Sequence, residues 1–303
     1  MRRREFLKKS LKFIITGAVA LKTGNYGDIF AFNNERYDLV SATGEDIKKL
    51  FKEGIKFLGG IEKFVKKGMI VVVKPNIGWN VPPERAANTN PELVGEIVKN
   101  CLNAGAKKVF VFDHTCDPWV KTYATSGIKD AVEKVGGKMV SANLQKDYIS
   151  VKIPMAKSLK TAKVFKLFLD ADCVINVPIL KDHRTTELTI GIKNLMGVVW
   201  DRWWWHANNL NQCIADFLAL RKPDLTVVDA YRVLIQNGPR GISENDVIKK
   251  NTIIISKDPV AADAAACKLI DKETKQIKHI QLAYEKNLGE INLKNLKIKR
   301  IVL

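Results

Sequence analysis

The sequence predicts an α/β protein whose largely parallel, or mixed, sheet carries helices on both faces. After residue 40, short β-branched runs alternate with stretches of helical period, the order expected of strands joined by crossover helices. The 303 residues suffice for one large domain. Hydrophobic residues make up 46% and charged residues 27%, which excludes a disordered chain and a polytopic membrane protein.

The first half of this alternation has clear helix signals. Asn90 and Pro91 open a predicted helix over 91–104, since asparagine accepts from free backbone amides and proline needs no amide donor there. A second helix over 127–135 ends at Gly136. The predicted strands of this half are 70–74, 109–113, 139–140 and 150–153.

The second half continues in the same way. Asp258 and Pro259 open a predicted helix that runs to residue 269. We expect one compact domain over residues 36–303, with a small lobe inserted around 140–165 or 197–206. The other predicted elements are a helix over 207–220 and strands over 173–177, 225–229, 252–256 and 298–303.

Residues 1–35 resemble an export leader followed by a connector. The string RREFLK at 3–8 matches the twin-arginine motif R-R-x-F-L-K, and AVA at 18–20 has the form of a cleavage site. The resemblance implies export of the folded protein to a periplasmic or other extracytoplasmic location. Lys22 leaves cleavage open, so the alternative is an uncleaved leader that anchors the protein to the membrane.

The chain is basic, with 50 lysines and arginines against 32 acidic residues and a net charge of +18. The lysines are scattered, which is typical of a solvated surface. The excess charge favours a small anionic molecule as partner, and contact with a membrane surface stays open. Nucleic acid is not an expected partner, because export separates the protein from it.

The five cysteines do not form a cluster motif. Their smallest spacing is fifteen residues, so the chain has no C-x-x-C and neither an iron–sulfur nor a zinc-ribbon motif. Cys116 stands between His114 and Asp117 and is a weak metal-site candidate. The cysteines expected to be buried thiols are Cys101, Cys173, Cys213 and Cys267.

Polar residues follow several predicted strands. Lys74 and Asn76 end the first strand, Lys181 and His183 follow a later one, and Asp229 ends another. Since ligands of parallel sheets bind beyond the carboxyl ends of the strands, we expect a basic pocket at this edge. No G-x-x-x-x-G-K-[ST] or G-x-G-x-x-G string occurs in that context, which disfavours a P-loop or dinucleotide site.

Residues 183–197 follow no clean period, and we expect a turn-rich loop whose backbone amides meet an anion. Lys193 would pair with a phosphate or carboxylate, and Asn194 would orient it. His183 and His206 are candidate metal ligands or acid–base groups, because histidine titrates nearest neutrality. A hydrogen-bonded structural role is the alternative for each histidine.

Residues 200–206 contain four of the six tryptophans. A lid over the site, a membrane-interface segment, a partner surface and a packed aromatic corner all fit this composition. His279 is expected on a surface helix and is assigned no role.

Six strings together resemble the domain of unknown function 362 family, which is uncharacterised: KPN at 74–76, NP at 90–91, VINVPILKDH at 174–183, GIKNLMG at 191–197, DA at 229–230 and DPVAAD at 258–263. Many members carry a ferredoxin-like domain with two iron–sulfur clusters. This chain lacks the cluster cysteines, so a separate iron–sulfur redox partner is the remaining option. The site candidates that the resemblance implies are Lys74, Asn76, Lys181, His183, Lys193, Asn194, His206, Asp229 and Asp263.

The hypothesis is an exported, redox-linked enzyme that holds a small anionic ligand or cofactor in this pocket. His183, His206 and Asp229 are the catalytic candidates, and the other six residues are the ligand-binding candidates. The enzyme class is open between an oxidoreductase and a racemase-like enzyme, the latter by analogy with nickel-pincer lactate racemases. The cofactor and any metal are unknown. The alternative is a non-catalytic periplasmic protein that binds or assembles a cofactor or anion.

Overall fold

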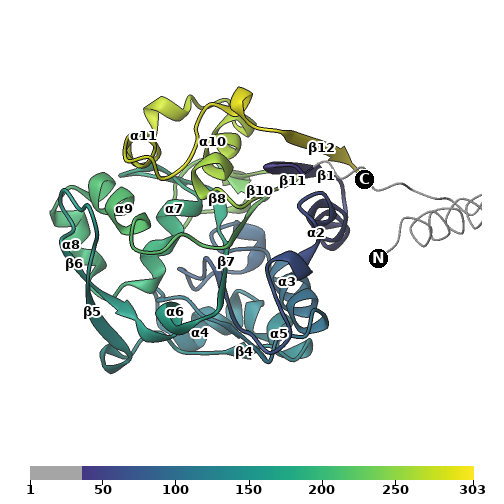
Figure 1. Cartoon of the computed structure of the whole chain (residues 1–303), viewed down its shortest axis with the longest axis horizontal. Coiled ribbons are helices and arrows are strands. Elements are labelled where there is room, and N and C mark those ends of the chain that lie inside the picture. The colour runs from purple at the N-terminus through teal and green to yellow at the C-terminus, as the bar shows by residue number, and fades with distance from the viewer. Residues whose placement is uncertain (1–35) are drawn as a thin grey trace, which may run out of the picture. The chain divides into compact units, whose positions relative to one another are not determined.

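The computed structural model describes residues 36–303, so the leader expected at residues 1–35 lies outside the described residues. Residues 36–303 form one compact unit (Figure 1). Among these residues, no helix has both the length and the apolar character needed to cross a membrane.

A ten-stranded sheet runs through this unit (Figure 1). Its strands are β1 (Leu39–Thr43), β2 (Ile70–Pro75), β3 (Lys108–Val111), β4 (Lys138–Met139), β7 (Cys173–Val177), β8 (Ile179–His183), β9 (Glu187–Thr189), β10 (Leu225–Leu234), β11 (Val247–Ser256) and β12 (Ile298–Val302). The main path is β12-β1-β11-β10-β7-β2-β3-β4, and β8 pairs with β10 and β9. Strands β4, β3, β2, β7 and β10 are parallel neighbours, whereas β11 is antiparallel to both β10 and β1. The predicted largely parallel, mixed sheet is confirmed.

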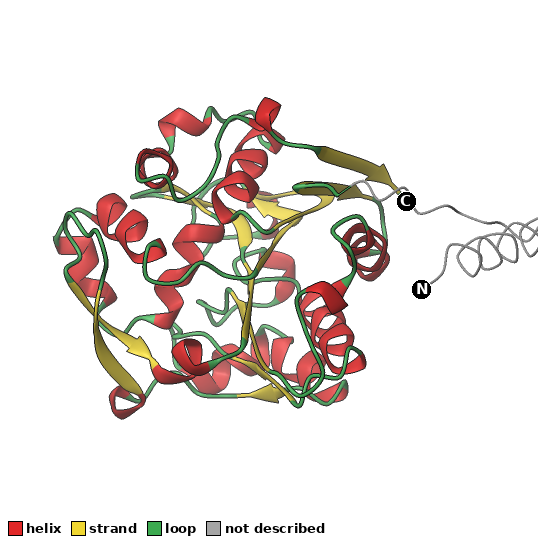
Figure 2. Ribbon diagram, in the orientation of Figure 1, coloured by secondary structure: helices red, strands yellow, loops and turns green. Residues whose placement is uncertain are grey.

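Helices cover both faces of the sheet (Figure 2). They are α2 (Ile47–Lys56), α3 (Pro91–Asn103), α4 (Trp119–Thr125), α5 (Ile128–Lys134), α6 (Lys166–Asp170), α7 (Gly191–Asn194), α8 (Arg202–Ala207), α9 (Leu210–Leu218), α10 (Pro259–Leu269) and α11 (Lys278–Glu285). Successive side chains of a strand point to opposite faces of the sheet, so each strand contributes residues to the hydrophobic clusters on both faces. Val72 and Val174 pack in the cluster that holds α9, α10 and α11, whereas Val71 and Ile175 pack with α2, α3 and α5.

The predicted helix starts are confirmed at two helices that flank the sheet. The Asn90 side chain accepts from Glu92 N at the start of α3, and Asp258 accepts from Val260 N and Ala261 N at the start of α10. Four of the five thiols, Cys116 excepted, are buried as expected. These caps fix where α3 and α10 begin, and α10 carries Asp263.

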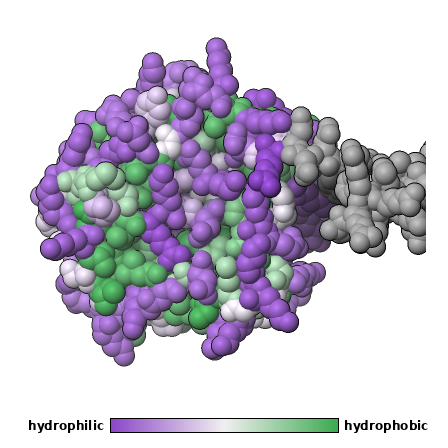
Figure 3. Space-filling model, in the orientation of Figure 1, coloured by the Kyte–Doolittle hydropathy of each residue, from purple (hydrophilic) through white to green (hydrophobic). Residues whose placement is uncertain are grey.

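A separate two-stranded sheet, β5 (Tyr148–Lys152) and β6 (Thr161–Phe165), lies within the first region where a lobe was expected. Strand β6 is not among the predicted elements. The Asp216 carboxylate accepts from Ser158 N at 2.7 Å and from Leu159 N at 3.0 Å and so holds the turn of this hairpin. Figure 3 shows a mostly hydrophilic face, with a hydrophobic area toward the lower left, where this hairpin lies in Figure 1.

Two expectations are wrong. Residues 183–197 are not a turn-rich loop: β8 and β9 form a hairpin, and α7 continues into a 3₁₀ turn at Leu195–Val198. The periods of a three-residue strand and a four-residue helix are too short to be recognised in a sequence. His279 is not on a solvated helix face, because its side chain is fully buried.

Candidate functional site

The carboxyl ends of β2, β3 and β8 border a cavity of about 540 Å³. Lys74 lies opposite Asn176 in the parallel pair β2–β7, and β8 continues the chain and carries Lys181 and His183. The cavity is lined by Asn76, Gly78, Trp79, Asp113, Cys116, Lys181, His183, Thr189, Lys193, Asn194, Met196, Gly197, Trp200, Arg202, Trp203, His206 and Pro239. The sheet thus gathers polar side chains that are up to 130 positions apart, from Asn76 to His206, at one edge.

A network of amide side chains fixes the inner wall of the cavity. Asn194 donates to Lys74 O at 3.2 Å and to Asn176 Oδ1 at 2.9 Å, and its own Oδ1 accepts from Asn76 Nδ2 at 3.0 Å. Asn176 donates in turn to Gly191 O at 2.9 Å. Because each amide has partners, their orientations are determined and α7 is tied to β2 and β7.

Lys74 is neutralised by a carboxylate. Its Nζ lies 2.7 Å from Asp113 Oδ1, and both side chains are buried. Nζ also donates to Pro75 O at 2.7 Å and to Asn194 Oδ1 at 3.2 Å. Burial lowers the pKa of Lys74, while Asp113 acts in the opposite direction. The pair therefore contributes little net charge to the cavity and serves to position Asn194.

Lys181 is buried in the cavity wall without a carboxylate partner among the described residues. Its Nζ donates to Asn76 Oδ1 at 3.1 Å and to Ala87 O. Burial, followed by the charge of Lys193, lowers the pKa of Lys181 to about 7. An anion in the cavity would reverse this effect, since opposite charge favours the protonated amine.

Lys193 has neither a hydrogen bond nor an ion pair to any described residue, although its residue surface is only 8% exposed. Burial, with Arg202 adding to it, lowers the pKa of Lys193 to about 8. The hydroxyl of Thr189, which also lines the cavity, is buried without a partner in the described part of the chain. The cavity thus contains two hydrogen-bond donors, the Lys193 ammonium and the Thr189 hydroxyl, without an acceptor among the described residues.

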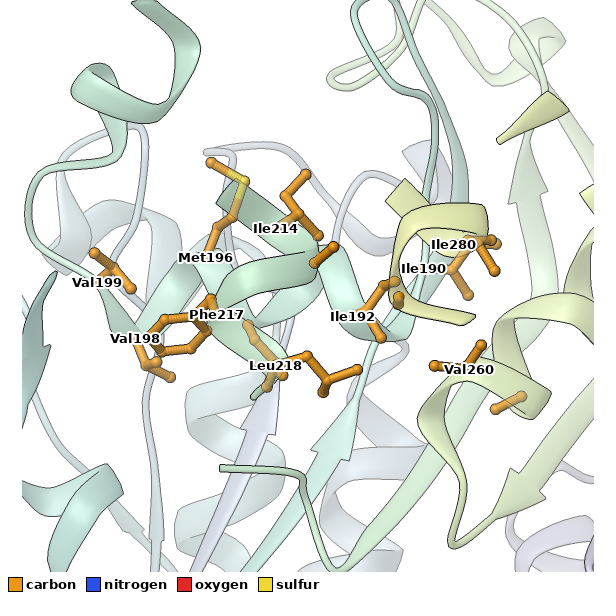
Figure 4. Packing of buried hydrophobic residues seen from close by; sticks show 14 of the residues in the cluster. Ile190, Ile192, Met196, Val198, Val199, Ile214, Phe217, Leu218, Val260 and Ile280 are labelled. Carbon is orange, nitrogen blue, oxygen red and sulfur yellow. The ribbon is translucent and has the colours of Figure 1, made fainter. Parts of the chain in front are cut away.

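Helix α7 places Lys193, and it is held from both sides. The Asp263 carboxylate accepts from Gly191 N at 2.6 Å and from Ile192 N at 3.0 Å. Ile190 and Ile192 pack into the hydrophobic cluster next to Val260 and Ile280 (Figure 4). Apolar packing of these two side chains thus leaves the next residue, Lys193, at the cavity.

Backbone amides fix the tautomer of the His183 ring. Its Nδ1 accepts from Thr185 N at 3.2 Å and from Thr186 N at 3.3 Å. Burial, followed by the charges of Lys193 and Lys181, lowers the pKa of His183 to about 2, so the ring is neutral. A neutral imidazole that accepts at Nδ1 carries its proton on Nε2.

His206 lies beside His183, with the two rings stacked at 6.5 Å between centroids. It is exposed at the cavity, and no hydrogen bond fixes its tautomer among residues 36–303. Partial burial, with the charges of Lys193 and Arg202 adding to it, lowers the pKa of His206. It is therefore the histidine of this pair that is free to accept or release a proton.

The tryptophan cluster divides into packed and exposed members. Trp200 stacks on His114 at 5.0 Å between ring centroids, and Trp205 is buried against Phe217. Trp203, in contrast, is 82% exposed beside the cavity.

Arg202 begins α8 and fixes its start at the cavity. It donates to Thr115 O at 2.9 Å, and its Nη1 lies 3.8 Å from Cys116 Sγ. With Lys181 and Lys193, it makes the cavity basic, since Asp113 is its one carboxylate among the lining residues described and is paired with Lys74.

The family model described as Domain of unknown function (DUF362) matches residues 71–268, more than half of the chain. The chain belongs to this family. The thylakoid-associated protein sll1697 of Synechocystis sp. is 28% identical over 201 residues, which are 60% of this chain and 58% of that protein. The chain thus spans less than two thirds of this relative's length. The lactate racemase apoprotein from Thermoanaerobacterium thermosaccharolyticum shares 14% identity at a TM-score of 0.48, over 80% of this chain and 59% of that one.

Within the DUF362 match, steric contacts explain why glycine stands at both ends of the string GIKNLMG. A Cβ atom at Gly191 would lie 2.5 Å from Asp263 Oδ1, and one at Gly197 would lie 1.8 Å from Asp113 Oδ1. A side chain at either position would displace a carboxylate that holds α7 or Lys74. The two glycines therefore leave room for the carboxylates of Asp263 and Asp113.

Six of the nine predicted site residues line the cavity of this DUF362 chain, and Lys74 lies directly behind its wall, whereas Asp229 and Asp263 lie away from it. Asp229 accepts from Asn90 N at 2.7 Å and from Tyr231 N at 3.0 Å, and burial raises its pKa to about 6. Asp263 holds α7, as above, and burial raises its pKa to about 8. Both carboxylates accept hydrogen bonds from backbone amides, and neither lines the cavity.

Four functional positions are missing from the sequence-based candidates: Asn176, Asp113, Thr189 and Arg202. Asn176 stands in the string VINVPILKDH, where a single polar residue inside a buried strand is the available signal. Asp113 ends the predicted strand 109–113, so its position at the carboxyl end of a strand is the available signal. No local signal identifies Thr189 or Arg202, because their position depends on the β8–β9 hairpin and on α8.

The structure does not assemble the weak metal site suggested by His114, Cys116 and Asp117. His114 Nδ1 bonds to Val199 O at 2.9 Å, and Asp117 accepts from Asn80 N at 2.8 Å. Over residues 36–303, no three His, Cys, Asp or Glu side chains are placed to share a metal ion.

Proposed function

We propose that this protein is an extracytoplasmic enzyme whose basic cavity binds a small anionic molecule through Lys193, Lys181 and Arg202. The observation that carries the proposal is the buried ammonium of Lys193, which has no partner in the described chain. Burying a charge without a counter-charge costs free energy, and a bound carboxylate or phosphate would recover it. Thr189 and the Nε2–H of His183 supply further donors to the same anion.

The catalytic part of the proposal rests on the two stacked histidines. His183 would polarise an oxygen of the ligand as a fixed neutral donor, and His206 would carry a proton. Asp229 has no role in it, because its carboxylate bonds to backbone amides outside the cavity. If the reaction is a redox reaction, a separate iron–sulfur protein would exchange the electrons. The alternative, a periplasmic protein that binds or assembles a cofactor or anion, uses the same cavity without turnover.

Calorimetric titration tests the anion site. Phosphate, acetate and lactate would be titrated into the wild type, Lys193→Met and the exposed-lysine control Lys107→Met. We expect at least one of these anions to bind the wild type and the control equally, and Lys193→Met at least about tenfold more weakly. Equal affinity for all three proteins, or no binding to any, would contradict the proposal.

Contact with a membrane surface is a second proposal, which the exposed side chain of Trp203 favours. The Synechocystis relative is named as thylakoid-associated, and tryptophan is favoured at membrane interfaces. Flotation with vesicles of anionic phospholipid tests it: Trp203→Ser should lower the bound fraction severalfold, whereas Trp119→Ser, on a different helix, should not. Equal flotation of both variants would reject Trp203 as the contact.

A further inference from the structure

The side chain of Lys193 has the features of an amine nucleophile. It lines a cavity that admits a small molecule, it is buried, and no acceptor in the described chain holds its protons. Arginine binds anions with more donors and stays charged, so anion binding alone does not require lysine here. Lysine differs from arginine in that it can lose a proton and attack.

We infer that Lys193 forms an imine with the carbonyl group of a small 2-oxo acid held in this cavity, an inference that rests on the proposed anion site. The carboxylate of such an acid would face the cations of Lys181 and Arg202. The Nε2–H of His183, which has no partner among the described residues, would donate to the carbonyl oxygen. The three groups that the reaction needs thus line one cavity.

The reaction balances without an external oxidant or reductant. The lone pair of the neutral Lys193 amine attacks the carbonyl carbon, and the π electrons of C=O move to the oxygen, which His183 stabilises. The two amine protons pass to that oxygen, and His206 is placed to carry them. The oxygen leaves as water, and a C=N bond replaces C=O.

The position of Lys193 supplies neutral amine near neutral pH. Burial and Arg202 lower its pKa to about 8, against 10.5 for a solvated lysine. At pH 7 the neutral fraction is therefore on the order of a hundredfold larger than on a surface lysine. An imine should form at this residue in preference to the many exposed lysines.

Reductive trapping tests the inference. The full-length protein would be incubated with pyruvate and sodium borohydride, digested and mapped by mass spectrometry. We expect one reduced pyruvate adduct on the peptide that contains Lys193, and none when lactate, which has no carbonyl, replaces pyruvate. Adducts spread over surface lysines, or located on Lys181, would overturn the assignment.

Lys193→Arg is the matched variant, because it keeps a cation and removes the nucleophile. It should still bind a non-carbonyl anion in calorimetry but form no adduct, and circular dichroism would verify its fold. Wild-type protein that binds the anion yet is not trapped overturns the imine while the anion site stands. Wild-type protein that binds no anion and is not trapped overturns both.

Discussion

At Lys193 the protein keeps an ammonium group in a position that burial makes unfavourable. The folded-state pKa is about 8, below the 10.5 of a solvated lysine, so the group binds fewer protons folded than unfolded between these values. The buried charge therefore lowers the free energy of unfolding by its full amount below pH 8, and this loss disappears as the pH rises toward 10.5. Ligand sites often carry such a cost.

Lys193→Met should accordingly stabilise the ligand-free protein. The methionine fills a similar volume without a charge, and we expect a gain on the order of 2 kcal/mol at pH 6.5 that shrinks by pH 10. Urea unfolding at both pH values measures it. A loss of stability at pH 6.5 would mean that the Lys193 ammonium already has a partner in the protein, which would contradict its role as an anion-binding group.

Gly197 shows how close the chain comes to the Lys74–Asp113 pair. Gly197→Ala places a Cβ 1.8 Å from Asp113 Oδ1, and we expect a loss of about 3 kcal/mol or more in unfolding free energy. Gly78→Ala is the control, because its nearest contact, Asn76 Oδ1, is at an ordinary 3.6 Å. Similar small losses for both variants would show that the Asp113 side chain can move away without cost.

Helix α7 is the element on which the site depends, and Asp263 is its principal anchor. Asp263→Ala leaves Gly191 N and Ile192 N buried without an acceptor, at a cost of about 1–3 kcal/mol for each. We expect lower stability and weaker anion binding, whereas Asp263→Asn, which keeps one acceptor oxygen, should lose less of both. Thermal melts and calorimetry measure the two effects. Unchanged anion affinity in Asp263→Ala would show that anion binding does not depend on the position of α7.

The elements with long periods could be predicted from the sequence, and the short ones could not. Strands β2 and β7 are runs of β-branched residues, and α3 and α10 have both a cap and a proline. The β8–β9 hairpin and α7 have three to five residues each, and their geometry follows from contacts with distant segments, such as Asp263. Lys181 and His183 are candidates because they follow a predicted strand, and Lys193 because it stands in the aperiodic segment 183–197, whereas the positions of Thr189 and Arg202 depend on tertiary structure alone.

For the whole molecule, the lowered pKa values make anion binding depend on pH. Lys181 and Lys193, with pKa values of about 7 and about 8, are both protonated below pH 7 and both neutral above pH 8 in the free protein. The association constant for a non-carbonyl anion should therefore fall about tenfold or more between pH 6.5 and 9. Calorimetry across this range checks the trend, and an affinity that is constant or rises with pH contradicts it.

The proposed export also concerns the whole chain, because the leader that would direct it lies outside the described residues. Replacing Arg3 and Arg4 together by lysine should retain the protein in the cytoplasm, because the twin-arginine pair is the recognised feature of such leaders. Arg2→Lys, next to the pair, is the control and should be exported normally. Cell fractionation measures both, and equal export of the two variants would reject the leader.

The cavity's affinity for an anion is tested most directly by a crystal structure grown with selenate. Anomalous scattering locates selenium without reference to the protein density. Selenate in the cavity, within hydrogen-bond distance of Lys193 Nζ, is the predicted result. Selenate bound only at surface lysines, with water alone beside Lys193, would contradict the account.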